Sequence, residues 1–143
     1  MSYSNSIIFG PIPSRRFGIS LGVDLSPSKK QCNFDCLYCE LEGAKTVEKM
    51  DEFPSVQEII SAIKYSFLKH SKIDVITITC NGEPTLYPNL DELVDEINKI
   101  KNNTKTLILS NGSTIYKKNI FKTLLKIDTV KLSLDCVSKK CFK

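Results

Sequence analysis

Short runs of β-branched and apolar residues occur four times along the chain, and each run is bounded by residues that favour turns. Such runs are typical of buried strands. Between them lie longer stretches whose apolar residues recur at three- and four-residue spacing, which predicts amphipathic helices. Strands that alternate with helices form right-handed β-α-β units with a parallel sheet. We therefore predict an α/β protein with about four parallel strands, over 19–25, 74–79, 105–110 and 129–134.

The predicted helices have recognisable start signals. Ser55 opens the first helix and has capping-box spacing with Glu58. Asn89 precedes the second helix and belongs to a residue type that caps helices with its side chain. The third helix is predicted over about 115–126. The segment 10–18, which precedes the first strand, is rich in Gly, Pro and Ser and predicts a loop.

Polar residues follow the predicted carboxyl end of every strand. In a parallel sheet these ends lie at one edge, where ligands gather. We therefore expect polar chemistry to converge there, from Cys32–Cys39, Asn81–Glu83, Ser110–Asn111 and Asp135.

Composition narrows the class of protein. The 143 residues are 41% hydrophobic and 25% charged, which is typical of a globular chain and excludes a collagen-like or disordered one. The length suits one domain over 1–143. No apolar run approaches the roughly 20 residues that span a bilayer, and the start of the chain lacks a signal-peptide pattern. We therefore expect a cytoplasmic protein without a membrane partner.

Charge is unevenly distributed along the chain. The net charge is +4, but residues 99–143 alone contain eleven lysines and two aspartates, which gives this segment +9. A lysine-rich segment attracts RNA or another anion. These lysines are scattered and have no interleaved aromatic residues, a pattern that favours solvated helix faces instead.

The cysteines carry the clearest chemical signal. Six cysteines are many for a reducing compartment, and Cys32, Cys36 and Cys39 lie within eight residues. Three thiolates at this spacing can hold a 4Fe-4S cluster and leave one iron open to another ligand. Structural zinc is the alternative, but it needs four Cys or His ligands, and the single His70 has no partner spacing. A thioredoxin-like pair would leave Cys32 unexplained, and disulfides would need an oxidising compartment.

Three motifs together resemble those of the radical S-adenosylmethionine (SAM) superfamily. Cys32–Cys39 has the family's C-x3-C-x2-C spacing with an aromatic residue, Tyr38, before the last cysteine. Asn81–Pro84 is similar to the family's Gly-Gly-Glu-Pro loop, and Ser110–Gly112 to its Thr-Asn-Gly turn. The opening segment, 10–27, further resembles a subgroup of iron–sulfur oxidoreductases related to wyosine-type tRNA-modifying enzymes. The resemblance covers essentially the whole chain.

The resemblance implies an enzyme with two cofactors. Cys32, Cys36 and Cys39 would bind three irons of a 4Fe-4S cluster, and SAM would chelate the fourth through its amino and carboxylate groups. Reduction by a protein such as flavodoxin or ferredoxin would then cleave SAM to a 5′-deoxyadenosyl radical. This radical would abstract hydrogen from a substrate that the sequence does not specify, tRNA being one candidate.

The resemblance also implies a SAM-binding set. Gly82 would let the backbone approach the bound amino acid closely, and Glu83 would accept hydrogen bonds from its amino group. Asn81 departs from the family's first glycine. Ser133 and Asp135 would reach the ribose, although capping of the strand end explains them equally well. The complete set is Tyr38, Asn81, Gly82, Glu83, Pro84, Ser110, Asn111, Ser133 and Asp135.

Chain length modifies this prediction. The radical SAM core is a six-stranded partial (β/α) barrel, whereas the pattern predicts four strands. We therefore expect residues 1–143 to be the N-terminal part of such a core domain, C-terminally truncated or completed by a missing half or a dimer partner. Two alternatives stay open, a fragment that binds the cluster or SAM without turnover and a zinc-stabilised structural domain.

Overall fold

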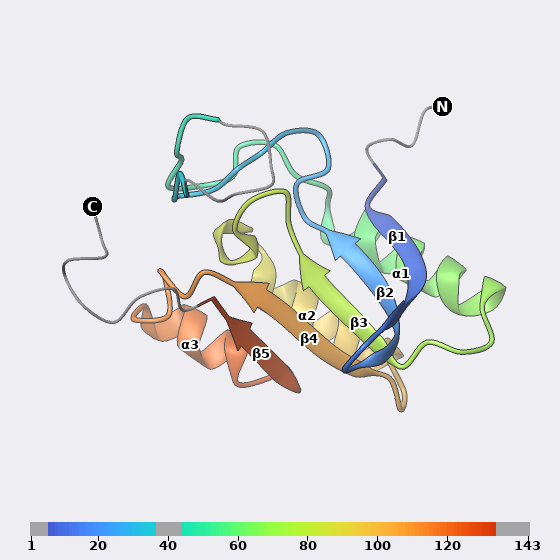
Figure 1. The fold of residues 1–143 in the computed structure, drawn as a ribbon. Helices are drawn as coiled ribbons and strands as arrows, with labels where there is room; N and C mark the ends of the chain where they lie inside the picture. Colours follow the sequence, from blue (N-terminus) through green and yellow to red (C-terminus); the bar gives the residue numbers. More distant parts are fainter. Residues whose placement is uncertain (1–5, 37–43, 134–143) are drawn as a thin grey trace.

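The computed structural model describes residues 6–36 and 44–133 of the chain. Its centre is a single five-stranded sheet in which the strands lie side by side in chain order (Figure 1). The first two strands pair antiparallel, and all later pairs are parallel. The strands are β1 (Ile8–Ser14), β2 (Gly18–Asp24), β3 (Val75–Thr79), β4 (Lys105–Ser110) and β5 (Thr129–Leu132).

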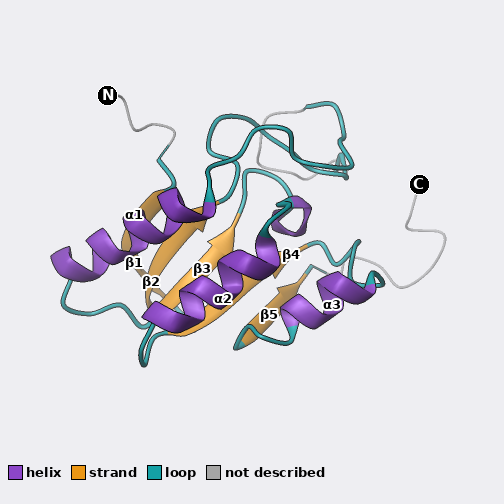
Figure 2. Ribbon diagram, turned by 180° about the vertical axis from the view of Figure 1, so that it is seen from behind, coloured by secondary structure: helices purple, strands orange, loops and turns teal. Residues whose placement is uncertain are grey.

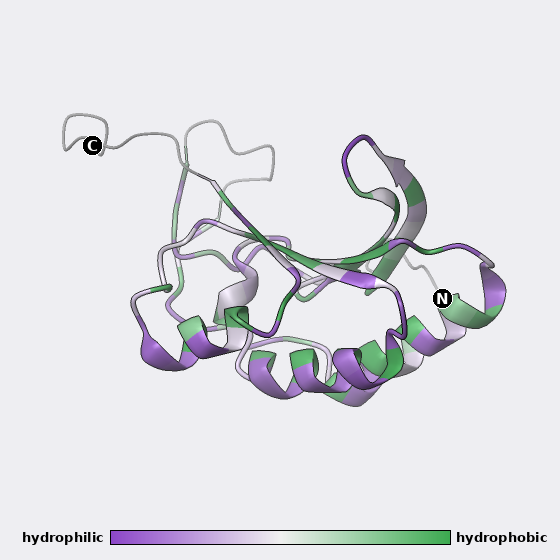
Figure 3. Ribbon diagram, turned by 90° about the horizontal axis from the view of Figure 1, so that it is seen from below, coloured by the Kyte–Doolittle hydropathy of each residue, from purple (hydrophilic) through white to green (hydrophobic). Residues whose placement is uncertain are grey.

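The helices cover one face of this sheet. Seen from behind, all three lie in front of the strands (Figure 2), and an edge-on view places them on the same side (Figure 3). A short 3-10 helix, η2, lies between β3 and the second α-helix. The bounds are α1 (Val56–Lys69), η2 (Pro84–Leu86), α2 (Leu90–Ile100) and α3 (Lys118–Leu124).

The predicted α/β class and the four parallel strands are confirmed, but the loop predicted over 10–18 is wrong. Most of that segment belongs to β1 and its turn into β2. Pro11 and Pro13 made the segment look like a loop, yet proline is tolerated in an edge strand, where an amide can face away from the neighbouring strand. The register of the hairpin also shifts between Phe9 and Ile12, so the strand lacks regular alternation.

Two helix starts differ in how they are capped. The predicted capping box is present: Glu58 N donates to Ser55 Oγ over 3.1 Å, and Ser55 N donates to Glu58 Oε2 over 2.7 Å. Asn89 precedes α2 as predicted, but its side chain makes no capping hydrogen bond. The third helix begins only at Lys118, because the residues before it form turns instead.

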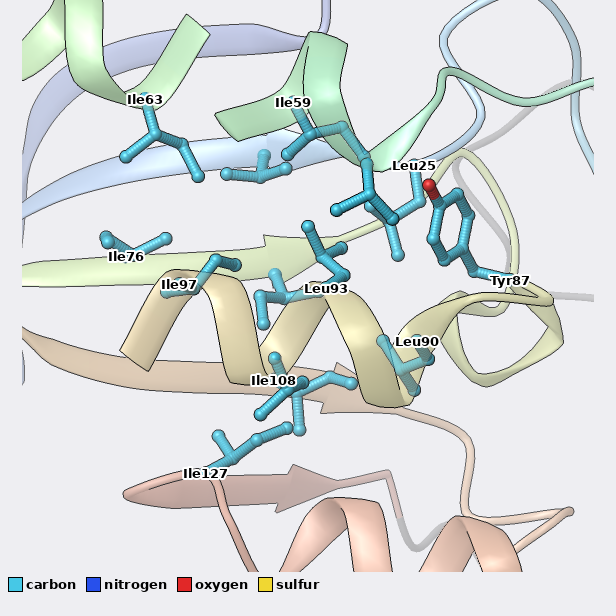
Figure 4. Close-up of a cluster of buried hydrophobic side chains, with 14 of the residues drawn as sticks. Leu25, Ile59, Ile63, Ile76, Tyr87, Leu90, Leu93, Ile97, Ile108 and Ile127 are labelled. Carbon is cyan, nitrogen blue, oxygen red and sulfur yellow. The ribbon is translucent and has the colours of Figure 1, made fainter. Parts of the chain in front are cut away.

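The main hydrophobic core fills the space between the helices and the sheet (Figure 4). Each fully buried aliphatic side chain contributes about 1.5–3 kcal/mol through burial, so this layer fixes which face of each strand points toward the helices. The members with no exposed surface are Leu21, Val23, Leu25, Ile59, Ile63, Ile76, Ile78, Leu93, Ile97 and Ile108. Among the residues that the structure describes, no helix has the length and apolar character needed to cross a membrane.

Candidate functional site

Loops from three parallel strands meet at the carboxyl edge of the sheet. The loop after β2 contacts the loop after β3 through a parallel bridge between Gln31 and Gly82. In this bridge Gln31 N donates to the Asn81 carbonyl over 2.9 Å, and Glu83 N donates to the Gln31 carbonyl over 3.0 Å. The bridge lies directly before Cys32, so the start of the cysteine segment is held against the Asn81–Pro84 motif.

Gly82 is required by this bridge. Its φ is +138°, and a Cβ at this position would overlap the carbonyl group of Gln31. The structure thus gives Gly82 a different reason to lack a side chain, because the group that approaches it closely is the protein backbone of Gln31. Contact between Gly82 and SAM stays a prediction.

Glu83 connects the β3 loop to the β4 loop. Its side chain is only 1% exposed. Oε1 accepts hydrogen bonds from Ser110 Oγ over 2.6 Å and from Thr85 Oγ1 over 2.7 Å, while Oε2 accepts from Asn111 N over 2.7 Å. A buried carboxylate is stable only when it is well paired or hydrogen-bonded. Glu83 therefore joins the second and third motifs into one unit.

Asn111 connects that unit to the cysteine segment. Its Nδ2 donates to Asn33 Oδ1 over 3.0 Å and lies 3.9 Å from Cys32 Sγ. Asn33 Nδ2 in turn donates to Ser113 Oγ over 2.7 Å. Residues separated by about 80 positions in sequence thus form one hydrogen-bonded network.

Two residues that the sequence did not indicate hold the loops in place through hydrogen bonds. The side-chain amide of Gln31, itself 1% exposed, donates to the Glu52 carbonyl over 2.6 Å and accepts from Asp51 N over 2.9 Å. Asp24, the last residue of β2, accepts from Asn81 N over 2.9 Å. In the sequence Asp24 is only a polar residue at a strand end and Gln31 only a polar residue before the first cysteine, and such features are too common to single out either one.

The described cysteines differ in environment. Cys32 and Cys36 are free and partly exposed. Burial raises the pKa of the Cys32 thiol, and the backbone N–H of Phe34, 3.4 Å from Sγ, opposes that rise. Burial raises the pKa of the Cys80 thiol well above its ordinary range, and the Asp24 carboxylate adds to this effect.

The predicted site residues are only in part described. The network brings together Asn81, Gly82, Glu83, Ser110 and Asn111. Pro84 begins η2 and is buried, and Ser133 N donates to the Ser110 carbonyl over 3.0 Å, which places Ser133 beside the end of β4. Tyr38, Cys39 and Asp135 lie outside the described residues, as do Cys136 and Cys141.

The donor set agrees in its chemistry with an iron–sulfur cluster. Two free thiols follow the carboxyl end of a parallel strand, in a segment anchored on both sides: Gln31 N donates to Asn81, and Val47 N donates to the Cys32 carbonyl over 2.9 Å. Thiolates are the usual ligands of such clusters. The described part of the site therefore fits the group, with Cys39 as the predicted third ligand.

The fold defines an α/β protein whose candidate site residues lie in loops at the carboxyl ends of parallel strands. Among known families, the family model described as "Radical SAM superfamily" matches residues 27–143 of the chain. The chain belongs to the radical SAM superfamily, and its four parallel strands with helices on one face correspond to part of the partial barrel of that fold.

Relatives extend this result over nearly the whole chain. The chain is 54% identical to a UPF0026 protein of Helicobacter pylori over 138 residues, which cover 96% of this chain and 45% of that protein. It is 34% identical to a UPF0026 protein of Methanocaldococcus jannaschii over 142 residues, covering 96% and 43% of the two chains. It is also 34% identical to a probable GTP 3′,8-cyclase of Methanococcus aeolicus over 128 residues, covering 87% and 40%. The chain thus spans less than half the length of each of these relatives.

Proposed function

We propose that this chain forms the cluster- and SAM-binding part of a radical SAM enzyme. The carrying observation is the network in which Glu83 joins the Asn81–Pro84 loop to the Ser110–Gly112 turn and Asn111 joins that turn to Cys32. A structural zinc domain would not need a buried carboxylate that links two further strand-end loops to the cysteine segment. The cysteine motif alone does not exclude such a domain.

The proposed roles of individual residues combine this arrangement with the family's cysteine motif. Cys32, Cys36 and Cys39 would supply the thiolates. When bound, a 4Fe-4S cluster would supply the one-electron reduction that cleaves SAM into methionine and a 5′-deoxyadenosyl radical, the species that would abstract a hydrogen atom from the substrate. An external one-electron reductant, such as flavodoxin or ferredoxin, would supply that electron. The hydrogen bonds among the protein residues would hold the loops at fixed positions.

Ser110 and Asn111 extend the proposed SAM site. Both use one group to bind Glu83, and they lie at the same edge of the sheet as Ser133. We propose that the remaining surface of these residues, together with Tyr38 and Asp135, contacts SAM. Asn81 and Pro84 would shape the loop around it.

Anaerobic reconstitution with iron and sulfide tests the proposal. We expect about four irons and four sulfides per chain, and a reduced EPR signal that changes when SAM is added. Stoichiometric zinc without iron uptake would contradict it. A well-loaded cluster that releases no 5′-deoxyadenosine under dithionite would leave a binding fragment without turnover.

Cysteine variants make the test specific to the proposed ligands. Cys32→Ser, Cys36→Ser and Cys39→Ser should each lose most of the iron content. Cys80→Ala is the matched control, because it removes a partly buried thiol from the same edge of the sheet while leaving all three proposed ligands in place. Equal iron loss in Cys80→Ala would contradict the assignment of ligands.

We further propose that the substrate is an RNA, of which tRNA is the candidate given by the subgroup resemblance. Three lysines of the basic segment are neutralised within the fold: Lys99 pairs with Glu96, Lys101 with Asp128, and Lys126 with Asp91 and Asp95. In contrast, Lys117, Lys118 and Lys122 take part in no ion pair among the described residues. Lys117 and Lys118 start α3, the helix that comes after the Ser110–Gly112 turn, and Lys122 lies one turn further along it.

Binding of tRNA at several salt concentrations tests this substrate class. The triple variant Lys117→Gln, Lys118→Gln, Lys122→Gln should weaken binding and reduce the salt slope by about one for each phosphate that is no longer neutralised. The triple variant Lys64→Gln, Lys69→Gln, Lys72→Gln removes the same charge from and just after α1, and should leave binding nearly unchanged. If the two triple variants bound tRNA equally well, Lys117, Lys118 and Lys122 would be ordinary solvated residues of a helix face.

A further inference from the structure

Hydrogen bonds at its backbone N–H and at its side-chain amide fix the orientation of Asn111. Its backbone N–H donates to the buried Glu83 carboxylate over 2.7 Å, which fixes where the side chain begins. Its Oδ1 accepts from Ser113 N over 2.9 Å. Because a backbone N–H can only donate, the atom facing Ser113 must be the oxygen. The amide orientation is therefore determined, and Nδ2 is the group that points toward the cysteine segment.

The two donors of Nδ2 have partners on that segment. One hydrogen bond runs to Asn33 Oδ1 over 3.0 Å, and Cys32 Sγ lies 3.9 Å away. Asn33 is itself fixed, because its Nδ2 donates to Ser113 Oγ over 2.7 Å. Together with the bond from Ser113 N to Asn111 Oδ1, these bonds form a closed ring between the β2 loop and the β4 loop.

Cys32 is thus approached by two N–H groups. Phe34 N lies 3.4 Å from Sγ on the cysteine's own loop, and Asn111 Nδ2 lies 3.9 Å away on another loop. The first depends only on local loop geometry. The contact from Asn111 requires the β4 loop to pack against the β2 loop. It is therefore present only when these two loops are assembled.

We propose that Asn111 is a positioning residue that donates an N–H···S hydrogen bond to the Cys32 thiolate and thereby raises the reduction potential of the bound cluster. This inference rests on the proposed function. Hydrogen bonds to the sulfurs tune the potential of iron–sulfur clusters, because a donor stabilises the more negative reduced state more than the oxidised state. The role is distinct from contact with SAM, which was the role that the sequence suggested for Asn111.

The midpoint potential of the reconstituted full chain, measured by an EPR-monitored titration without SAM, tests this inference. Asn111→Leu removes the donor without adding charge and should shift the potential to a more negative value. Asn111→Asp keeps the shape and the acceptor for Ser113, and it should shift the potential further because it replaces the donor by a negative charge. Asn119→Leu and Asn119→Asp make the same changes on the exposed surface of α3 and should leave the potential unchanged.

A second variant separates hydrogen bonding to sulfur from simple holding of the loop. Asn33→Ala opens the ring but retains the Asn111 amide, so the potential should stay near that of the unchanged protein. A negative shift in Asn33→Ala equal to that in Asn111→Leu would overturn the inference in favour of loop holding. An unchanged potential in both Asn111 variants with full iron content would also overturn it, whether or not the same variants bind SAM more weakly. Failure of the unchanged protein to take up iron would instead reject the proposed function.

Discussion

The carbonyl group of Gln31 occupies the space into which a side chain on Gly82 would extend. The two residues belong to different loops, 51 positions apart, and they pair as neighbouring strands do. The bridge is isolated, without regular strand structure on either side. Because the Gln31 carbonyl approaches so closely, the contact depends on Gly82 having no Cβ. It also sets how far the cysteine segment lies from the Asn81–Pro84 loop.

Gly82→Ala should therefore lower the free energy of unfolding by about 2–5 kcal/mol, through backbone strain and overpacking together. Denaturant unfolding followed by circular dichroism measures the loss. Gly112→Ala is the matched control: Gly112 also has a positive φ, +74°, but a Cβ there would meet only the Leu132 side chain at 3.7 Å. That variant should lose about 1 kcal/mol, from the left-handed conformation alone. Equal losses would show that the Gln31 contact is unimportant.

Capping of the first two α-helices should differ in energy. Ser55→Ala removes a side-chain acceptor that receives the Glu58 N–H, and should lower the free energy of unfolding by about 1 kcal/mol. Asn89→Ala should change it by only a few tenths of a kcal/mol, because the Asn89 side chain makes no capping bond. Urea unfolding of both variants measures the difference. A larger loss in Asn89→Ala would contradict the described α2 start.

Asp128 should make stability depend on acid pH. The Lys101 ammonium, 2.6 Å away, together with the Thr106 N–H, lowers the pKa of Asp128 from 3.8 to about 2. Because the folded pKa is below the unfolded value, the stabilisation is complete above about pH 5 and is lost as pH falls from about 4 toward 2. After allowance for solvent screening, we expect about 1 kcal/mol from this group.

Urea unfolding between pH 7 and pH 2 measures that contribution as the difference between the unchanged protein and Asp128→Asn. The variant should be less stable at pH 7 and should converge with the unchanged protein near pH 2. Asp51→Asn is the control, because the Asp51 side chain pairs with Lys29 but is 77% exposed. A constant difference at every pH would show that Asp128 acts through packing and not through its charge.

Cys80 should react slowly in the folded protein. Burial raises the pKa of its thiol, so the reactive thiolate is scarce at pH 8. Iodoacetamide labelling, located by mass spectrometry, should be roughly tenfold slower at Cys80 in the folded chain than in the urea-unfolded chain. Labelling at the same rate in both states would place Cys80 on the surface.

Repetitive features of the chain were predictable from sequence, and single long-range contacts were not. Strands β2 to β5 and the capping box at Ser55 follow from apolar spacing and local residue types, and the structure confirms them. Strand β1 was missed because its prolines and its irregular register conceal the alternation. Asn89 has the right residue type for a cap, but its side chain is not used as one.

The same distinction applies to the candidate site. Motif spacing predicted that polar residues would meet at one edge, and Glu83, Ser110 and Asn111 do so. The sequence did not indicate that the buried Glu83 carboxylate is already held by protein donors, or that Gln31 supplies the group that Gly82 accommodates. Such contacts depend on how two loops approach each other in three dimensions, and no local pattern records that distance.

The two edges of the sheet are not equivalent for association with another chain. Strand β1 contains Pro11 and Pro13, which have no amide hydrogen, and its register is irregular, so it is a poor template for an added strand. Within the described residues β5 pairs only with β4 and has no proline, so its outer backbone groups offer regular hydrogen-bonding positions. Any segment that extends this sheet, from the same polypeptide or from another, should therefore join beside β5. The two prolines at the β1 edge thus restrict extension of the sheet to the β5 edge.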